Sequence, residues 1–400
     1  MKKIYKVDLF DTALLALSTL TLIYANKSVI SWLLLLLVLA IALYNALTNG
    51  LYVNKVILAW MINLCWASIG LMYAPDFGKG LSYVIKLGIL AISLTYNSGK
   101  ASNQKIHRLF SLIAYIYMLA VVLEIIFPAD IGRIRRMYAA SNQWIDRTDR
   151  LISVYNTKFG FFVDPAVSAF YCSFCVGVGY LFLRRHQYLK SIVWLIPAVV
   201  GLVLTNKRGP ILFTVVTVII MYIIESKKNT ATKIKTIAVL LLVSLGGYYL
   251  MTENRVVQEW LIKINSNVAS NQNRLGAYAS QWENFIKHPF WGSGTKSSSS
   301  ILNGMDGHNI YLAALSENGL FGFIILLYCL LAGLKLTLKT YAQLSDSFDK
   351  NEVMLALYMQ MFICLYGFTG NPFSNLYSLA VYFTSLGIVI RTHRRFCLIP

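Results

Sequence analysis

The chain has 400 residues, a formal net charge of +19, 57% hydrophobic residues and only 13% charged residues. An ordinary soluble domain carries about 25% charged residues. The composition therefore excludes a conventional soluble globular protein. It predicts an all-α polytopic membrane protein, because backbone groups in lipid must form hydrogen bonds within their own segment.

Apolar runs along the chain predict about twelve membrane-spanning helices, since roughly 18 apolar residues suffice for one span. In chain order they lie near residues 10–25, 28–47, 53–73, 80–96, 108–127, 162–183, 190–205, 209–225, 236–251, 308–334, 352–369 and 373–390. No cleavage signature follows the first run, so we interpret it as a retained span. Residues 1–400 then form a single integral membrane domain.

The distribution of basic residues predicts the orientation, because short cytoplasmic loops are enriched in Lys and Arg. Such residues gather in the short loops on the side of both termini, for example at Lys2 and Arg391. Both termini are therefore predicted to be cytoplasmic. The two long loops, residues 128–161 and 252–307, become extracytoplasmic. Long structured loops commonly carry function, and scattered aromatic residues favour structure in both loops. The second loop is predicted to be the catalytic one.

The first long loop is strongly basic at Arg133, Arg135 and Arg136. These arginines could cover an anionic lipid head as a lid, or they could anchor the loop to anionic lipid. Both interpretations stay open, and Arg135 and Arg136 are kept as substrate-binding candidates.

A short external turn, TNKRGP at residues 205–210, provides a third basic site. Arg208 is held between two apolar spans, and Gly209 lets another backbone approach closely. Arginine suits phosphate because its planar fork can donate two hydrogen bonds at once. Arg208 is therefore predicted to bind an anion. Lys207 either joins it or extends to the lipid headgroups.

Residues 270–288 of the second loop show helical spacing of apolar side chains, among them Leu275, Tyr278 and Trp282. We expect this stripe to pack on the membrane surface. Pro289 ends the helix, and Arg274 is expected in its first turn.

The sequence HPFWGSG follows this helix. Gly292 and Gly294 are expected to admit a ligand close to backbone N–H groups. His288 is a second candidate base, although orienting the turn is the interpretation that we favour. The serine run at residues 297–300 is expected to be a mobile tip.

The stretch from Gly307 to Tyr311 opens a long apolar helix, with Asn309 as its predicted N-cap. A histidine here feels the positive end of the helix dipole. That field favours a neutral imidazole, which can accept a proton. His308 is therefore a candidate general base. Glu317, two and a half turns on, is expected to bond neighbouring helices.

Taken in order, NKRG, NRLGAYASQW, HPFWGSG and GHNIYLAALSENGLFG resemble motifs of the O-antigen polymerase and O-antigen ligase superfamily of bacterial envelope glycosyltransferases. The resemblance covers roughly residues 155–325 and is strongest from Arg274 to Gly322. The stretch FGFFVDPAVSAFY is also similar. It departs from the family pattern in having Asp164 before Pro165, so Asp164 is assigned no role.

The resemblance implies a GT-C type glycosyltransferase that uses no metal, cofactor or nucleotide sugar. The implied donor is a glycan on undecaprenyl diphosphate at the outer face of the bacterial cytoplasmic membrane. His308 matches the family's His in the HN pair, with Asn309 beside it. Arg208 and Arg274 match the arginines thought to hold the diphosphate. A single displacement should invert the anomeric centre, and the sequence has no D-x-D pair.

Three functions remain open. The chain could polymerise lipid-linked repeat units of a capsule, O-antigen or exopolysaccharide, or act as a ligase that transfers finished glycan to another acceptor. A transporter or flippase is the third, with Lys86 and Glu124 as its few charged candidates in or near spans. We favour the polymerase.

Its partners would be lipid-linked oligosaccharides as donor and acceptor, membrane lipid, and a chain-length regulator or flippase that the sequence does not identify. No nucleic acid is expected.

Overall fold

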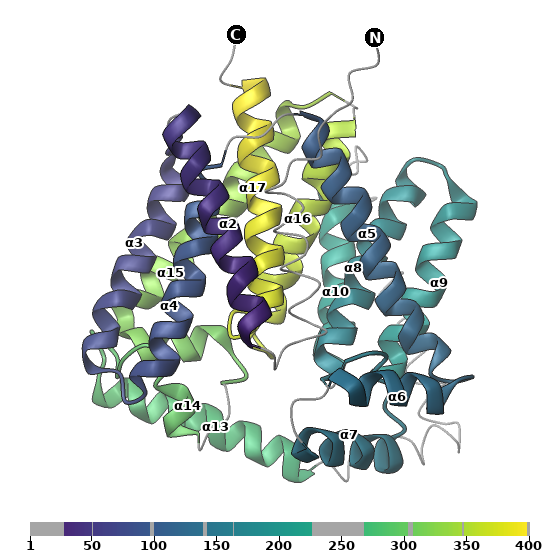
Figure 1. Ribbon diagram of the computed structural model, residues 1–400, viewed down its shortest axis with the longest axis horizontal. Helices are drawn as coiled ribbons and strands as arrows, with labels where there is room; N and C mark the ends of the chain where they lie inside the picture. Colours follow the sequence, from purple (N-terminus) through teal and green to yellow (C-terminus); the bar gives the residue numbers. More distant parts are fainter. Residues whose placement is uncertain are drawn as a thin grey trace.

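The computed structural model describes residues 28–49, 51–96, 100–138, 142–162, 164–225, 268–302, 307–345 and 348–397 (Figure 1). Every regular element within these ranges is a helix, which confirms the all-α prediction. The predicted spans at residues 10–25 and 236–251 lie outside the described residues, as does the first part of the second long loop.

A bundle of ten long helices makes up most of the described chain, and each overlaps one of the remaining predicted spans. They are α2 (Ser28–Asn49), α3 (Lys55–Gly70), α4 (Phe77–Ser93), α5 (Lys100–Leu123), α8 (Pro165–Arg184), α9 (Tyr188–Leu204), α10 (Arg208–Glu225), α15 (Ile310–Gln343), α16 (Phe348–Tyr366) and α17 (Leu376–Cys397). Within the described residues, four helical segments are long and apolar enough to cross a membrane. They are α8, α10, α15 and Lys55–Tyr73, in which the 3-10 turn η1 (Leu71–Tyr73) extends α3.

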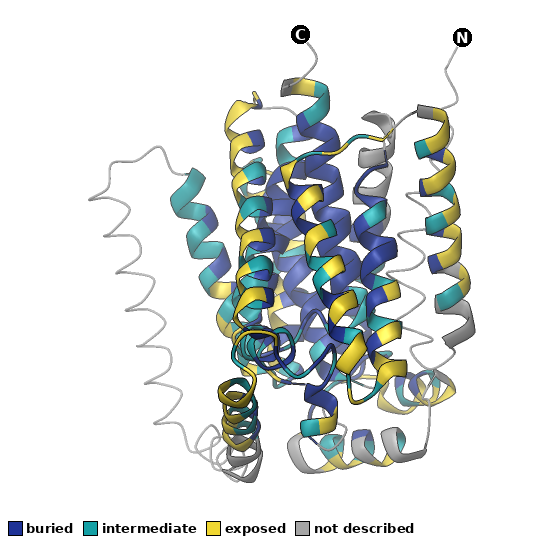
Figure 2. Ribbon diagram, turned by 90° about the vertical axis from the view of Figure 1, so that its left-hand side faces the viewer, coloured by how far each residue is buried: buried dark blue, intermediate teal, exposed yellow. Residues whose placement is uncertain are grey.

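The centre of the bundle is formed by α8, α16 and α17, whose residues are mostly buried (Figure 2). Trp60, Tyr382 and Phe383 pack edge to face in this core, with ring centroids 4.7–5.6 Å from Trp60. The outer faces of the surrounding helices carry exposed apolar side chains such as Ile196 and Leu331. Apolar residues on both the inside and the outside are typical of helices surrounded by lipid.

Several helices begin where a polar side chain satisfies their first backbone N–H groups. Asn54 accepts from Val56 and Ile57 at the start of α3. Asp164 accepts from Ala166 at the start of α8, which gives this departure from the family pattern a capping role. Asn309 caps α15, as predicted.

Four further helices lie across one end of the bundle (bottom of Figure 1). They are α6 (Pro128–Tyr138), α7 (Asn142–Tyr155), α13 (Val268–Lys287) and α14 (Ser298–Ile301). Both long loops therefore contain helices and share this end, opposite the end of α17. The helix extends beyond its predicted start at residue 270. Its described part runs from Val268, so Arg274 lies past the first turn rather than in it.

The inward face of α13 is made of small and polar residues, with Ala277 and Gln281 buried. The Asn284 Nδ2 donates to the Ser316 carbonyl (3.0 Å) and to the Ser293 hydroxyl (2.6 Å). Leu275 and Trp282 of the predicted apolar stripe are 65% and 48% exposed.

The serine run is not an exposed tip. Ser297, Ser298 and Ser299 are buried. The Ser297 and Ser293 hydroxyls lie 2.7 Å apart, and Gln281 Nε2 donates to Ser298 Oγ (3.3 Å). These hydrogen bonds replace the bonds to water that the serine hydroxyls lose when the segment is buried.

A break in α15 explains the glycines of HPFWGSG. Gly319 has φ +65° and interrupts the helix. The N–H groups of Ser293 and Gly294 donate to the Ser316 and Glu317 carbonyls (both 3.0 Å), and Leu320 N donates to the Pro289 carbonyl (2.8 Å). Gly292 and Gly294 are thus needed for close approach to protein backbone. The expectation that Gly294 N–H serves a ligand is wrong, because this N–H is already used.

Candidate functional site

The turn between α16 and α17, residues 367–375, is the point at which the segments carrying the predicted site residues meet. It contains two glycines, an asparagine and a proline in the sequence GFTGNPF. Ile310 N donates to the Gly367 carbonyl (2.9 Å), and Asn309 Nδ2 donates to the Phe368 carbonyl (3.1 Å). These bonds attach the start of α15 to the α16–α17 turn.

His308 directly precedes this attachment and is exposed. The Asn309 Oδ1 accepts from the N–H groups of Tyr311 (2.9 Å) and Leu312 (3.1 Å), so the same residue caps α15 and holds it against the α16–α17 turn. The Tyr278 hydroxyl of α13 donates to the His308 carbonyl (3.5 Å). The backbone of His308 is therefore held from both sides, and the residue is exposed.

Arg208 is the first residue of α10 and is exposed, and its neighbour Gly209 lies close to the α16–α17 turn. A Cβ on Gly209 would lie 2.5 Å from Thr369 Oγ1 and 3.5 Å from Tyr366 Cε2. The close approach that Gly209 was predicted to allow is therefore to this turn. Asn206 takes φ +53° where the chain reverses from α9 into α10. Lys207, between Asn206 and Arg208 in the sequence, is half-buried.

Arg274 lies half-buried on α13 and interacts electrostatically with the hydroxyls of Tyr278 and Tyr366. Partial burial raises the pKa of Tyr278, and the positive charge of Arg274 opposes this effect. Tyr278 therefore stays a neutral phenol at physiological pH and can donate a hydrogen bond. Through Tyr278 and Tyr366, Arg274 is placed between the His308 segment and the last residue of α16.

The three residues predicted to be catalytic thus come from separate segments that adjoin one turn. Arg208 and Arg274 supply two guanidinium groups, which suit a phosphorylated anion. His308 supplies an accessible imidazole, which suits proton transfer. The structure brings together the surroundings of all three at the end of the bundle covered by α13.

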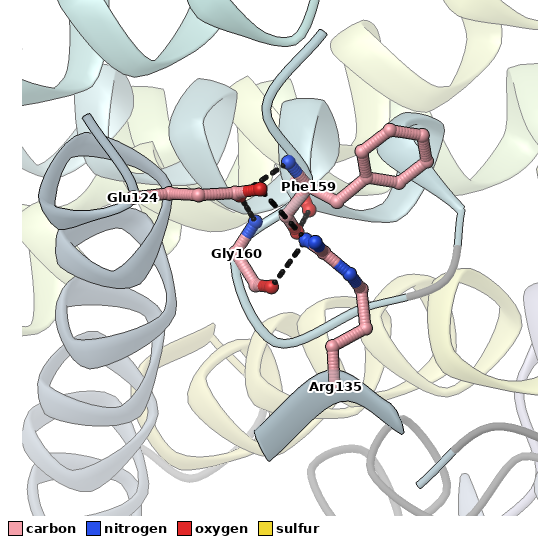
Figure 3. Close-up of polar contacts among 5 residues, drawn as sticks. Glu124, Arg135, Phe159 and Gly160 are labelled. Carbon is pink, nitrogen blue, oxygen red and sulfur yellow. Dashed lines mark hydrogen bonds and ion pairs between the residues drawn. The ribbon is translucent and has the colours of Figure 1, made fainter. Parts of the chain in front are cut away.

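Arg135 has a different place, which the sequence did not reveal. It is 4% exposed, and its Nη1 donates to Glu124 Oε1 (2.9 Å) and to the Gly160 carbonyl (3.1 Å) (Figure 3). Glu124 Oε2 also accepts from the N–H groups of Phe159 (2.8 Å) and Gly160 (2.7 Å). Arg135 thereby ties α6 to the segment that enters α8, so we remove it from the substrate contacts.

The remaining candidates are also located. Arg136 forms an exposed ion pair with Asp149, which joins α6 to α7 (2.8 Å). His288 directly follows α13, and its carbonyl accepts from Gly292 N (3.0 Å). Its backbone thus shapes the HPFWGSG turn at the break in α15. This agrees with the orienting role favoured from the sequence.

The α16–α17 turn itself was missed. Glycine and Asn-Pro between two apolar runs are a turn signal, and the predicted spans at residues 352–369 and 373–390 left only a short connection there. Nothing in the local sequence indicated that Tyr366 and Thr369 contact the NKRG turn.

Comparison with known families concerns the same part of the chain. Residues 191–327 match the family model described as O-antigen ligase. This match is consistent with the O-antigen polymerase and ligase superfamily. The matched segment includes Arg208, Arg274 and His308, and it overlaps most of the region where the motifs resemble that superfamily. No curated protein matches the chain.

Proposed function

We propose that the chain is a membrane glycosyltransferase that joins repeat units carried on undecaprenyl diphosphate into a capsular, O-antigen or exopolysaccharide. The observation that supports this proposal is the proximity of three segments to the α16–α17 turn. Gly209 of the NKRG turn lies close to Thr369, Asn309 donates to the Phe368 carbonyl, and the charge of Arg274 acts on Tyr366. In the proposal, two guanidinium groups and one imidazole share a reaction centre beside this turn.

In the proposed reaction, a hydroxyl of an acceptor sugar attacks the anomeric carbon of the donor glycan. The new carbon–oxygen bond forms as the bond from the anomeric carbon to the diphosphate oxygen breaks. Undecaprenyl diphosphate leaves with the electron pair, and His308 takes the hydroxyl proton. One displacement of this kind inverts the anomeric centre.

The developing negative charge on the diphosphate is where the arginines act. Fixed donors aimed at such charge lower a barrier by about 3 kcal/mol each, and Arg208 and Arg274 are the groups assigned to it. A positioned base adds roughly a hundred- to ten-thousand-fold. Because arginine supplies the counter-charge, we expect transfer to proceed in EDTA.

The site is assigned to the extracytoplasmic side of the bacterial cytoplasmic membrane. Support comes from the shared end of α6, α7, α13 and the α16–α17 turn, which lies opposite the basic end of α17 at Arg394 and Arg395. The basic end fits the cytoplasm, because short cytoplasmic segments are enriched in Lys and Arg.

Transport is less well supported. Glu124 is engaged with Arg135 and two backbone N–H groups, and the Lys86 ammonium lies 5.6 Å from the centre of the Trp32 ring. Both charges considered for a flippase have packing partners. The ligase remains the second candidate, because the matching family model is described as O-antigen ligase.

The test uses the purified full-length protein, lipid-diphosphate oligosaccharide and EDTA. Lipid-linked dimers and longer products support the polymerase, whereas product only with an added acceptor supports the ligase. His308→Ala and Arg274→Ala should each abolish product, with expression and thermal unfolding as controls. Near-wild-type turnover in either variant overturns the site assignment.

A further inference from the structure

A pocket lies beside the candidate site, between α3, α4, α15 and the α16–α17 turn. The space between its walls is about 520 Å³ when the open mouth is counted. The lining residues used below are Asn63, Trp66, Tyr83, Lys296, Glu317 and Asn318. None of these was assigned a function from the sequence.

Two amide side chains in this pocket lie on helices that are otherwise apolar. Asn63 is half-buried on α3, and Asn318 stands at the break in α15. The Asn318 Oδ1 is buried and has no hydrogen-bond partner within the described residues. A buried polar atom without a partner costs free energy, so this position favours a polar ligand.

Lys296 adds an independent sign of function. It takes the left-handed conformation at φ +64°, which is rare for a residue other than glycine, asparagine or aspartate. Its N–H donates to Glu317 Oε2 (3.2 Å), and its ammonium lies 5.1 Å from the centre of the Tyr83 ring. Glycine would adopt this backbone without strain, and strained residues of this kind cluster at ligand sites.

The chemistry of the lining distinguishes this pocket from the arginine side of the site. It combines amides, aromatic rings at Trp66 and Tyr83, and one acid with one base. Amides both donate and accept hydrogen bonds, as hydroxyl groups require. Lys296 and Glu317 give the lining one positive and one negative charge. A neutral polyhydroxyl ligand fits this set better than a diphosphate.

The pocket is connected to the site through two residues. Ile310 lines it, and its N–H donates to the Gly367 carbonyl (2.9 Å). Asn371 of the α16–α17 turn also lines it. His308 precedes Ile310 by two residues, so its segment adjoins both this pocket and the turn that contacts Gly209. We propose that the pocket binds a neutral sugar residue of the acceptor, an inference that rests on the proposed transfer reaction.

The test measures binding to the full-length protein in nanodiscs prepared without sugar-headed detergents, which would compete. One probe is the diphosphate-free oligosaccharide released by mild acid from the host's lipid-linked repeat units, and the other is undecaprenyl diphosphate. Asn318→Ala and Asn63→Leu should each weaken oligosaccharide binding at least tenfold and raise the acceptor KM by a similar factor. Undecaprenyl diphosphate binding should not change.

Ser68→Ala, an exposed substitution on α3, is the matched control. The thermal unfolding temperature of Asn318→Ala should stay equal or rise, because its Oδ1 has no protein partner to lose, whereas a merely structural amide would lower it. Unchanged oligosaccharide affinity in both pocket variants overturns the proposal, even if transfer is active. Equal loss of that affinity in Arg208→Ala also overturns it. If both pocket variants weaken oligosaccharide binding but the wild-type protein shows no transfer, the sugar site is supported and the proposed function is contradicted.

Discussion

Asn309 joins two helices with one side chain: its Nδ2 donates to the Phe368 carbonyl (3.1 Å) while its Oδ1 caps α15. His308 is the next residue toward the N-terminus, so its position depends on both interactions.

Substitutions at Asn309 separate these two interactions. Asn309→Ser keeps an N-cap but loses the bond to Phe368, which contributes about 1 kcal/mol. Asn309→Ala also loses the cap, worth about 1 kcal/mol more. We expect a fall in kcat for both variants and a larger loss of thermal stability for Asn309→Ala. Full activity in Asn309→Ser would show that the link to Phe368 does not position His308.

Gly209→Ala tests the contact that places Arg208. The new methyl group would meet Thr369 Oγ1 at 2.5 Å and displace α10 from the α16–α17 turn. A misplacement of about 1 Å in a catalytic group costs on the order of a hundred-fold in rate. We therefore expect kcat to fall by about that factor, as measured by polymer formation.

The double variant Gly209→Ala/Thr369→Ala is the control. Thr369 Oγ1 has no hydrogen-bond partner in the described part of the chain, so removing it loses little and clears the space. Activity should return toward wild type. If the double variant stays as slow as Gly209→Ala, steric overlap with Thr369 is not the cause.

Glu124→Gln tests the buried connection between α5, α6 and the segment before α8. Breaking a buried ion pair costs about 3–5 kcal/mol, because the partner charge is left buried without compensation. Arg135 would be that partner, since it is 4% exposed. Chemical or thermal unfolding in detergent should show a strong destabilisation.

The Arg136–Asp149 pair provides the matched comparison. Its side chains are 60% and 45% exposed, and exposed pairs contribute about 0–1 kcal/mol. Arg136→Ala should therefore unfold at nearly the wild-type temperature. Equal effects of Glu124→Gln and Arg136→Ala would argue against a structural role for the buried pair.

A pair of glycine substitutions tests the break in α15. Gly319→Ala forces a side chain into φ +65° and against the Phe290 carbonyl, which should destabilise the protein by at least about 2 kcal/mol. Gly276 lies in α13, and no atom lies within 4 Å of the position that an added methyl group would take. Gly276→Ala should stabilise the protein by up to about 1 kcal/mol. The two unfolding temperatures should therefore move in opposite directions.

The hydrophobic pattern and the local capping residues of the sequence were enough to predict most of the helices. Apolar runs predicted the helices, because a helix in lipid satisfies its own backbone. Asn309 was recognisable as a cap, and the order of NKRG, HPFWGSG and HN motifs indicated the superfamily, because those signals are local. Local signals also failed at Arg135. Nothing near it in the sequence indicates that it is buried against Glu124, so it was grouped with Arg133 and Arg136.

Tertiary structure alone decided which segments meet. The α16–α17 turn contacts residues as distant in sequence as Asn309 and Gly209, and such contacts depend on how helices pack rather than on local sequence. Packing also turned the serine run inward and used the Gly294 N–H for protein backbone. Packing also placed Asn63, Lys296 and Asn318 around one pocket. The role of a polar side chain on an apolar helix depends on the residues that face it from other helices, which the sequence does not reveal.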